Sequence, residues 1–331
     1  MSNTNESQTN VTAEQQYQGL LGLLFFSTVS TVPCCVFLFI NVTLLFTLRS
    51  KPVFRETSRY VFLFNLLFAD TVLLAHSQLL YLLAVCRIRM TYPVCGVFAL
   101  FASLTTVISP LTLVVMSLER YVAVCYPLRH ATIMTIRNTG VAIVLVWAVS
   151  SLNVLIQAIL LLNFPFEDLQ SLQMKDFCDK DSMLLGPMSD LYDKAFTGFL
   201  FVSAGVAITC SYIGVMVAAR SASTNSASAR KALNTLLLHL VQLGLSLSST
   251  VHNPLLIAIS KVLDRIIIVR IQTVLYMCII ILPRCLSALI YGIRDQNIRP
   301  ILVYHLCCHW KCSPLRSVVT ARAKISIFTT S

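Results

Sequence analysis

Seven stretches of this chain are apolar over more residues than a helix needs to cross a bilayer. They fall at Gln15–Leu48, Tyr60–Cys86, Met90–Leu118, Asn138–Phe166, Ala195–Ala219, Ala232–Ser260 and Ile271–Ile293. A transmembrane helix needs roughly 20 such residues to span about 30 Å of hydrocarbon. The runs lack the alternating pattern of barrel strands. Only 12% of the 331 residues are charged, against about 25% in soluble domains. The sequence therefore predicts an all-α membrane protein with seven transmembrane helices.

The basic residues predict which way these helices run. With the N-terminus outside, sixteen of the 25 Lys and Arg residues fall in cytoplasmic segments and eight in outer ones. The positive-inside rule favours this orientation. We therefore expect an extracellular tail at residues 1–16, a seven-helix domain at 17–293, and a cytoplasmic tail with a short amphipathic helix at 294–331. The net charge of +11 is explained by the basic inner face meeting anionic lipid, without a nucleic acid partner.

Two ionisable side chains interrupt the apolar runs, Asp70 in the second and Arg284 in the seventh. Ionised groups at this depth are costly and usually mark a functional site. At 1.5 Å per residue, Asp70 lies about 16 Å from Arg59, Arg284 about 15 Å from Arg294, and Ser109 at a similar height above Arg120. The three side chains reach one layer, which predicts a buried ion pair between Asp70 and Arg284. Arg284 reaching a water-filled cavity alone is the alternative.

Two of the twelve cysteines, Cys95 and Cys178, are predicted to form a disulfide at the outer surface. Cys95 lies about 37 Å above Arg120 along a helix, and Cys178 is in the long outer loop between Asn163 and Lys194. Both sit in an oxidising compartment, where a disulfide can persist. Cys86 is a competing partner near the same face. The loop itself is acidic, and it is either a solvated connection or a lid over a ligand entrance.

The tails carry candidate modification sites. Asn5 and Asn10 begin Asn-x-Ser/Thr sequons in the tail assigned outside, so we expect glycosylation there. The C-terminal segment HLCCHWKC contains Cys307, Cys308 and Cys312. It lacks the paired C-x-x-C spacing typical of zinc ligands, so we expect no metal site and favour palmitoylation near the membrane.

The inner end of the third run carries the most specific motif of the chain. Residues Ser117–Leu128 read SLERYVAVCYPL. Taken alone, Glu119-Arg120 could be an ordinary interfacial ion pair. Among seven helices, the segment resembles the acid-Arg-Tyr motif of class A (rhodopsin-like) G-protein-coupled receptors. Its longer form resembles the odorant receptor version, D/E-R-Y-V-A-x-C-x-P-L.

Other segments resemble the same family. They are Asn65-Leu66 with Asp70, Trp147, Ser211-Tyr212, Lys231–Thr235 with His239-Leu240, and Ser287–Asp295. Two features depart from the family: Ser287-Ala288 replaces its Asn-Pro, and the fifth helix has no proline. Ser287 is therefore counted with the buried polar layer of Asp70, Ser109 and Arg284. The resemblance spans Asn41 to Arg299 and is closest to fish-type odorant receptors.

The resemblance implies that an agonist binds in the outer half, that the sixth helix swings outward, and that Arg120 is exposed to a G protein. Glu119, Tyr121, Tyr212 and Tyr291 are the other switch residues that it implies. Depth counts place nine side chains in the outer half, and ordinary helix packing explains each of them equally well. They are Ala102, Ser103, Thr106, Phe199, Ser203, Leu247, Thr250, Val251 and Tyr276.

The leading hypothesis is a receptor for a small odorant that activates a stimulatory heterotrimeric G protein. Ala102 occupies the position where amine receptors of this family carry an acid, and the last helix has no lysine for a retinal Schiff base. A receptor for a steroid or lipid is the nearest alternative, and a secondary transporter using Asp70 and Arg284 is another. The sequence has no HExxH motif and no second intramembrane acid, so it does not suggest an enzyme, and we expect no cofactor.

Overall fold

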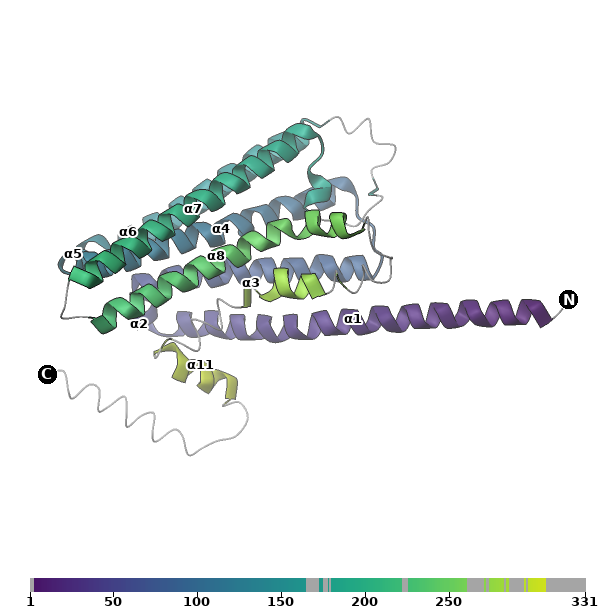
Figure 1. Cartoon of the computed structure of the whole chain (residues 1–331), viewed down its shortest axis with the longest axis horizontal. Helices are drawn as coiled ribbons and strands as arrows, with labels where there is room; N and C mark the ends of the chain where they lie inside the picture. The colour runs from purple at the N-terminus through teal and green to yellow at the C-terminus, as the bar shows by residue number, and fades with distance from the viewer. Residues whose placement is uncertain are drawn as a thin grey trace.

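The computed structural model describes residues 3–164, 173–174, 178, 180–221, 226–260, 271, 274–282, 284–285, 295 and 297–307. Over these residues the chain forms a bundle of long helices that run side by side (Figure 1). The long helices are α1 (Asn3–Ser50), α3 (Ser58–Val85), α4 (Tyr92–Cys125), α6 (Ile136–Leu162), α7 (Pro187–Ser221) and α8 (Ser226–Ser260). The shorter ones are α2 (Pro52–Arg55), α5 (Pro127–Ile133), η2 (Asp181–Met183), the π-helical η3 (Tyr276–Ile281) and α11 (Ile298–Cys307). We call the end that carries α2, α5 and α11 the inner end, and the opposite end the outer end.

Local sequence signals set where several helices begin. Pro52, Pro93 and Pro127 occupy the first turns of α2, α4 and α5, where the fixed φ of proline suits a helix and its missing N–H leaves no bond unmade. The hydroxyl of Thr135 caps α6 by accepting a hydrogen bond from the backbone N of Asn138 at 3.2 Å. Because these signals set where the helices begin, the short connections between helices lie at the ends of the bundle.

Within the described residues, five helices are long and apolar enough to cross a membrane. These spans are Ser27–Ser50, Ser58–Val85, Tyr92–Cys125, Ile136–Leu162 and Pro187–Ala218. The sixth predicted run lies in α8, where the apolar helix Ala232–Ser248 is shorter. The seventh is described only in part and contains η3, a wide π-helical turn that the sequence did not predict. Residues predicted to form a polar outer tail are helical from Asn3 onward and continue into the first span.

Helix α4 lies at the centre of the bundle and packs against α3, α6, α7 and α8. The largest buried cluster joins Leu63 and Leu66 of α3, Leu113 of α4 and Ile208 of α7. Within lipid, close van der Waals packing and hydrogen bonds hold helices together, because the surrounding tails are as apolar as leucine. A central α4 can therefore present side chains to most of the other helices.

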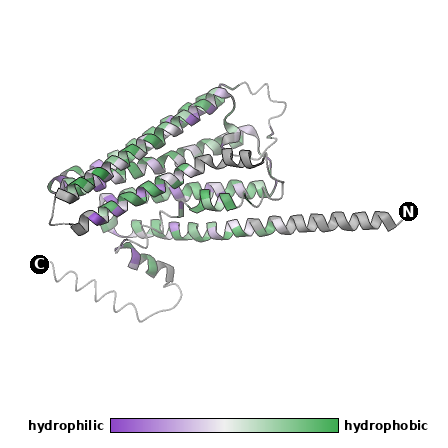
Figure 2. Cartoon of the chain, in the orientation of Figure 1, coloured by the Kyte–Doolittle hydropathy of each residue, from purple (hydrophilic) through white to green (hydrophobic). Residues whose placement is uncertain are grey.

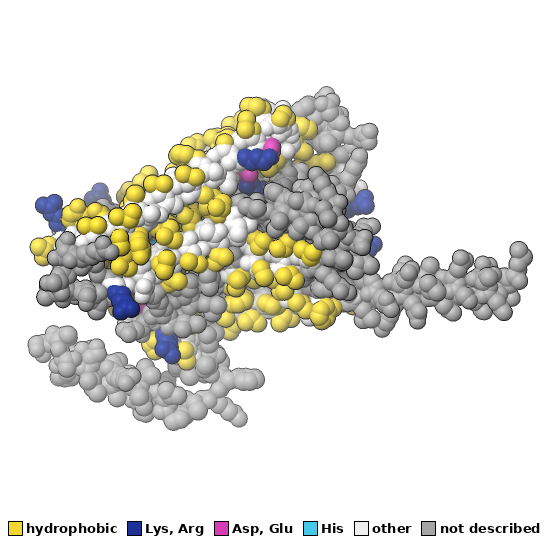
Figure 3. Space-filling view, in the orientation of Figure 1, with side chains coloured by type: hydrophobic (Ala, Val, Ile, Leu, Met, Phe, Trp, Pro, Cys, Tyr) yellow, Lys and Arg dark blue, Asp and Glu magenta, His cyan; other side chains and the backbone are white. Residues whose placement is uncertain are grey.

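The described helices are largely hydrophobic along their length, as helices in a bilayer should be (Figure 2). On α7, Phe199, Val202 and Val206 are 73%, 68% and 58% exposed and form one stripe along the helix. The space-filling view shows apolar side chains along the helices, with the visible Lys and Arg side chains near the ends of the bundle (Figure 3). This distribution matches a bilayer around the helices and water at both ends.

Candidate functional site

The predicted coupling motif lies at the inner end of α4, where its acidic side chain is buried. Nε of Arg120 is 3.1 Å from Oε2 of Glu119, and Glu119 is 5% exposed. The other carboxylate oxygen, Oε1, is 3.6 Å from Nε2 of His130 in α5. Glu119 therefore links the adjacent arginine to the short helix that follows α4. His130 was not predicted from the sequence.

Tyr121, the third residue of the motif, packs between α7 and α8. It belongs to a cluster built around the buried Val215 of α7 and Leu236 of α8, and Tyr212 joins the same cluster. A Cβ added at Gly214 would overlap the Tyr121 ring. Only a glycine therefore allows α7 to approach α4 this closely, and sequence reasoning did not find it.

A polar layer crosses the middle of the bundle. Oγ of Ser109 donates a hydrogen bond to Oδ1 of Asp70 at 2.6 Å, and Asp70 is 4% exposed. The charge of Asp70 also acts on Arg284, whose Nε is buried. The structure thus brings Asp70 and Ser109 into contact and places Arg284 within electrostatic range of the carboxylate. The fourth predicted member, Ser287, lies outside the described residues.

A second polar chain joins α3, α4 and α6. Nε1 of Trp147 donates to Oδ1 of Asn65 at 2.9 Å. Nδ2 of Asn65 donates in turn to Oγ1 of Thr112, also at 2.9 Å. These directional bonds fix the rotation of the three helices relative to one another, which apolar packing alone leaves loosely determined.

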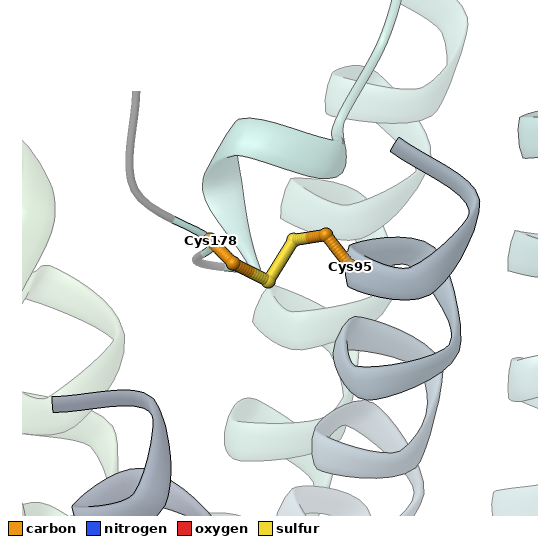
Figure 4. The surroundings of a disulfide bond; sticks show 2 residues. All are labelled: Cys95 and Cys178. Carbon is orange, nitrogen blue, oxygen red and sulfur yellow. A yellow bond between two sulfur atoms is a disulfide. The ribbon is translucent and has the colours of Figure 1, made fainter. Parts of the chain in front are cut away.

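The disulfide between Cys95 and Cys178 ties the outer loop to α4 (Figure 4), with the two Cα atoms 5.5 Å apart. The competing partner, Cys86, is an exposed free cysteine. A backbone hydrogen bond of 3.0 Å from Met174 N to Met90 O adds a second attachment. Met174 and Cys178 of the loop are therefore both held close to the outer end of α4.

The same loop is also attached to α7. Nζ of Lys180 is 2.7 Å from Oδ1 of Asp193, and this oxygen accepts a hydrogen bond from Nε2 of Gln157 at 3.1 Å. Lys180 therefore binds the loop to α7 through Asp193, and Gln157 of α6 contacts the same carboxylate. The charges of the loop are thus not only a solvated surface.

The predicted pocket residues of α4 differ in their surroundings. Ala102 and Thr106 are partly exposed, and the Thr106 hydroxyl donates to Ala102 O at 2.8 Å. Ser103 is 2% exposed and accepts a hydrogen bond from Nδ2 of Asn153 at 3.4 Å. Oδ1 of Asn153 accepts from the Tyr192 hydroxyl at 3.1 Å. Ser103 therefore faces α6 and α7 in a closed polar contact.

On α7, the structure places Phe199 and Ser203 away from the bundle. Both are exposed, and Phe199 lies on the lipid-facing stripe described above. A depth count determines the height of a side chain but not its direction around the helix. These two side chains therefore do not line a pocket inside the bundle.

The other predicted pocket residues lie on α8 and in the seventh segment. Leu247 is 41% exposed. The ring of Tyr276 stacks on Tyr81 with 5.0 Å between centroids, and its hydroxyl donates to Oε1 of Gln78 at 3.4 Å. The side chains of Thr250 and Val251 lie outside those that the structure describes.

Several further predictions also concern residues outside the described part of the chain. They are Tyr291, Cys308 and Cys312, together with the side chains of Asn5, Asn10 and Cys307. Their roles in switching, acylation and glycosylation stay predictions.

The family of the protein is shown by comparison with known sequences. Residues 40–312 match the seven-transmembrane receptors of the rhodopsin family. The chain therefore belongs to this family, the class A G-protein-coupled receptors. It is a multi-pass membrane receptor, not an enzyme.

Individual relatives show which receptors within this family the chain resembles. Odorant receptor 131-2 of Danio rerio is 32% identical over 300 residues, covering 88% of this chain and 90% of that protein. Putative olfactory receptor 1F12P of Homo sapiens is 31% identical over 211 residues, covering 62% of this chain and 60% of that protein. The predicted similarity to fish odorant receptors is thus confirmed.

Proposed function

We propose that this chain is an odorant receptor that activates a stimulatory heterotrimeric G protein. The observation that carries the proposal is the inner end of α4, where Glu119 holds Arg120 at 3.1 Å and Tyr121 packs against α7 and α8. The names of the relatives support an odorant as the ligand class. The N-terminus faces outward and residues 294–331 face the cytoplasm.

Activation follows from the packing around Tyr121. When α8 moves away from α4, Leu236 leaves the cluster that holds Tyr121 and Val215. This movement uncovers the inner end of α4, so that Arg120 is exposed to the G protein. Because the Glu119 carboxylate contacts both Arg120 and His130, it stabilises the resting arrangement of this region.

The odorant binds in the outer half of the bundle, beneath the disulfide-bonded loop. Ala102 and Thr106 of α4, Leu247, Thr250 and Val251 of α8, and Tyr276 of the seventh segment line the pocket. Such a lining is apolar with a few hydroxyl groups, which suits a small molecule with one hydrogen-bonding function. The loop is a lid over this pocket.

If Arg120 couples the receptor to the G protein, its substitution should abolish signalling without preventing folding. Arg120→Ala should reach the cell surface at the wild-type density but give no cAMP response. Glu119→Gln should raise basal cAMP, because the carboxylate that holds Arg120 is neutralised while its shape is kept. Surface labelling and cAMP are measured in the same cells. A full agonist response from Arg120→Ala would show that the coupling site is elsewhere.

The ligand class is tested by a screen of small volatile compounds, steroids and lipids on cells reporting cAMP, with Arg120→Ala as the negative control. Responses confined to volatile compounds support the proposal. Responses confined to steroids or lipids would reassign the receptor to that ligand class. Uptake of substrate without cAMP would instead indicate a transporter.

A further inference from the structure

A second buried charge cluster lies at the inner end, apart from Glu119 and Arg120. Oδ2 of Asp295, just before α11, is 3.0 Å from Nη2 of Arg59 at the start of α3. The Tyr60 hydroxyl lies 3.3 Å from Oδ1 and 3.4 Å from Oδ2 of the same carboxylate. Asp295 is 7% exposed, so the carboxylate of the pair is largely shielded from water, whereas the Arg59 side chain is 26% exposed. Sequence reasoning did not predict this cluster.

The same carboxylate caps α11. Oδ1 of Asp295 accepts hydrogen bonds from the backbone N of Asn297 at 2.9 Å and of Ile298 at 3.4 Å. An acidic side chain at a helix N-terminus satisfies free N–H groups and complements the helix dipole. Nδ2 of Asn297 also donates to the Tyr60 hydroxyl at 3.0 Å. One side chain therefore joins the start of α11 to the start of α3.

Apolar packing lies beneath this polar contact. Ile298 and Leu302 of α11 are buried in one cluster with Leu48, Phe54 and Tyr60. Helix α11 lies under the inner ends of α1 and α2 (Figure 1), and it packs against α1. Because apolar contacts have little directional preference, the bonds of Asp295 are what fix the orientation of α11.

Arg59 also lies within electrostatic reach of the moving helix. The charges of Arg59 and Arg120 both act on His239 of α8, which is completely buried. Arg59 and Arg120 therefore both lie near His239, in the inner half of α8. Asp295 neutralises one of them, as Glu119 does the other.

We propose that Asp295 is a positioning residue for coupling to the G protein. Its carboxylate neutralises the charge of Arg59 and holds the Arg59 guanidinium close to the start of α11. Without it, Arg59 carries an uncompensated charge in the field of Arg120. Repulsion between Arg59 of α3 and Arg120 of α4 then destabilises the resting position of Arg120 beside Glu119. This inference rests on the proposed function.

Three variants separate charge from structure. Asp295→Asn removes the charge but keeps a good helix cap. Arg59→Gln removes the cation, and the double variant removes both. The measurement is nucleotide exchange on a purified stimulatory heterotrimer, catalysed by the receptor in nanodiscs without ligand. We expect Asp295→Asn to raise the exchange rate about fivefold, the lower end of typical coupling between distant sites. Arg59→Gln and the double variant should stay near the wild-type rate.

The exposed Arg55 of α2 supplies a matched control, since Arg55→Gln removes a nearby positive charge outside the cluster. Equal effects of Asp295→Asn and Arg59→Gln would mean that the pair is merely structural, and an unchanged Asp295→Asn would likewise overturn the proposal. If neither the wild type nor Glu119→Gln catalyses exchange, the proposed function fails. Amide hydrogen exchange in α11 then tests separately whether the Asp295–Arg59 contact holds α11 in place. Faster exchange in Arg59→Gln than in Arg55→Gln supports this role of the contact, and equal rates overturn it.

Discussion

At the scale of single residues, Asp70 poses the sharpest physical problem in the bundle. Its carboxylate is 4% exposed, and one hydrogen bond of 2.6 Å from Ser109 does not replace the water that it loses on burial. A buried charge needs a partner of opposite sign. Arg284 lies within electrostatic range, so we infer that its guanidinium is the fixed counter-ion of Asp70.

The ion pair predicts that two harmful substitutions partly cancel. Asp70→Asn or Arg284→Met alone leaves an uncompensated charge, which commonly costs about 3–5 kcal/mol. The double neutral variant should recover part of the loss in thermal stability of the purified receptor. Ser109→Ala is the control, because it removes only a hydrogen bond to the carboxylate and should cost about 1.5–3 kcal/mol. A double variant as unstable as the sum of the single ones, or agonist potency that depends on sodium, would contradict the pair.

At the scale of helices, the approach of α7 to α4 depends on the missing side chain of Gly214. The Tyr121 ring occupies the space where a Cβ would lie, and the same ring packs against Val215 and Leu236. A substitution at Gly214 therefore acts on the coupling motif through packing alone.

Gly214→Ala should displace the Tyr121 ring and change basal cAMP, at an overpacking cost of about 1–3 kcal/mol. Gly205 of α7 is the matched control, because the nearest atom to its added Cβ is Cδ2 of Leu243, an ordinary contact at 4.0 Å. Gly205→Ala should leave signalling unchanged. Both variants are compared by surface density and basal cAMP, and equal behaviour would rule out the steric role of Gly214.

At the scale of the whole molecule, the outer loop is held by attachments to separate helices. The disulfide of Cys95 and Cys178 joins it to α4, and Lys180 with Asp193 joins it to α7. A loop held at both helices can cover the region between them, which is what a lid over the proposed pocket requires.

Cys95→Ser and Cys178→Ser should both trap the receptor in the secretory pathway, since losing a structural disulfide costs about 2–5 kcal/mol. Lys180→Gln should reach the surface but respond to agonist with altered potency. Lys194→Gln, which breaks the exposed pair with Asp190 at 2.7 Å, should have little effect. Surface labelling and agonist concentration–response curves distinguish the variants. Peptide mapping that linked Cys95 to Cys86 would contradict the pairing.

The sequence alone determined the helical class, the number of membrane runs and the height of side chains along each helix. Apolar length is a local property, and a helix rises by a constant 1.5 Å per residue. For this reason, depth counts brought Asp70 and Ser109 to one layer, and the structure joins them by a hydrogen bond. The motif around Arg120 could likewise be recognised from the sequence, because its residues are consecutive.

The tertiary structure alone decided which way each side chain faces. A membrane helix is apolar on both its lipid face and its packed face, so the hydrophobic pattern hardly encodes its rotation. Depth counts could therefore not tell the buried Ser103 from the lipid-facing Phe199. Nor could they pair Tyr60 with Asp295, 235 residues apart, because only packing of α11 beneath the bundle brings those two side chains together.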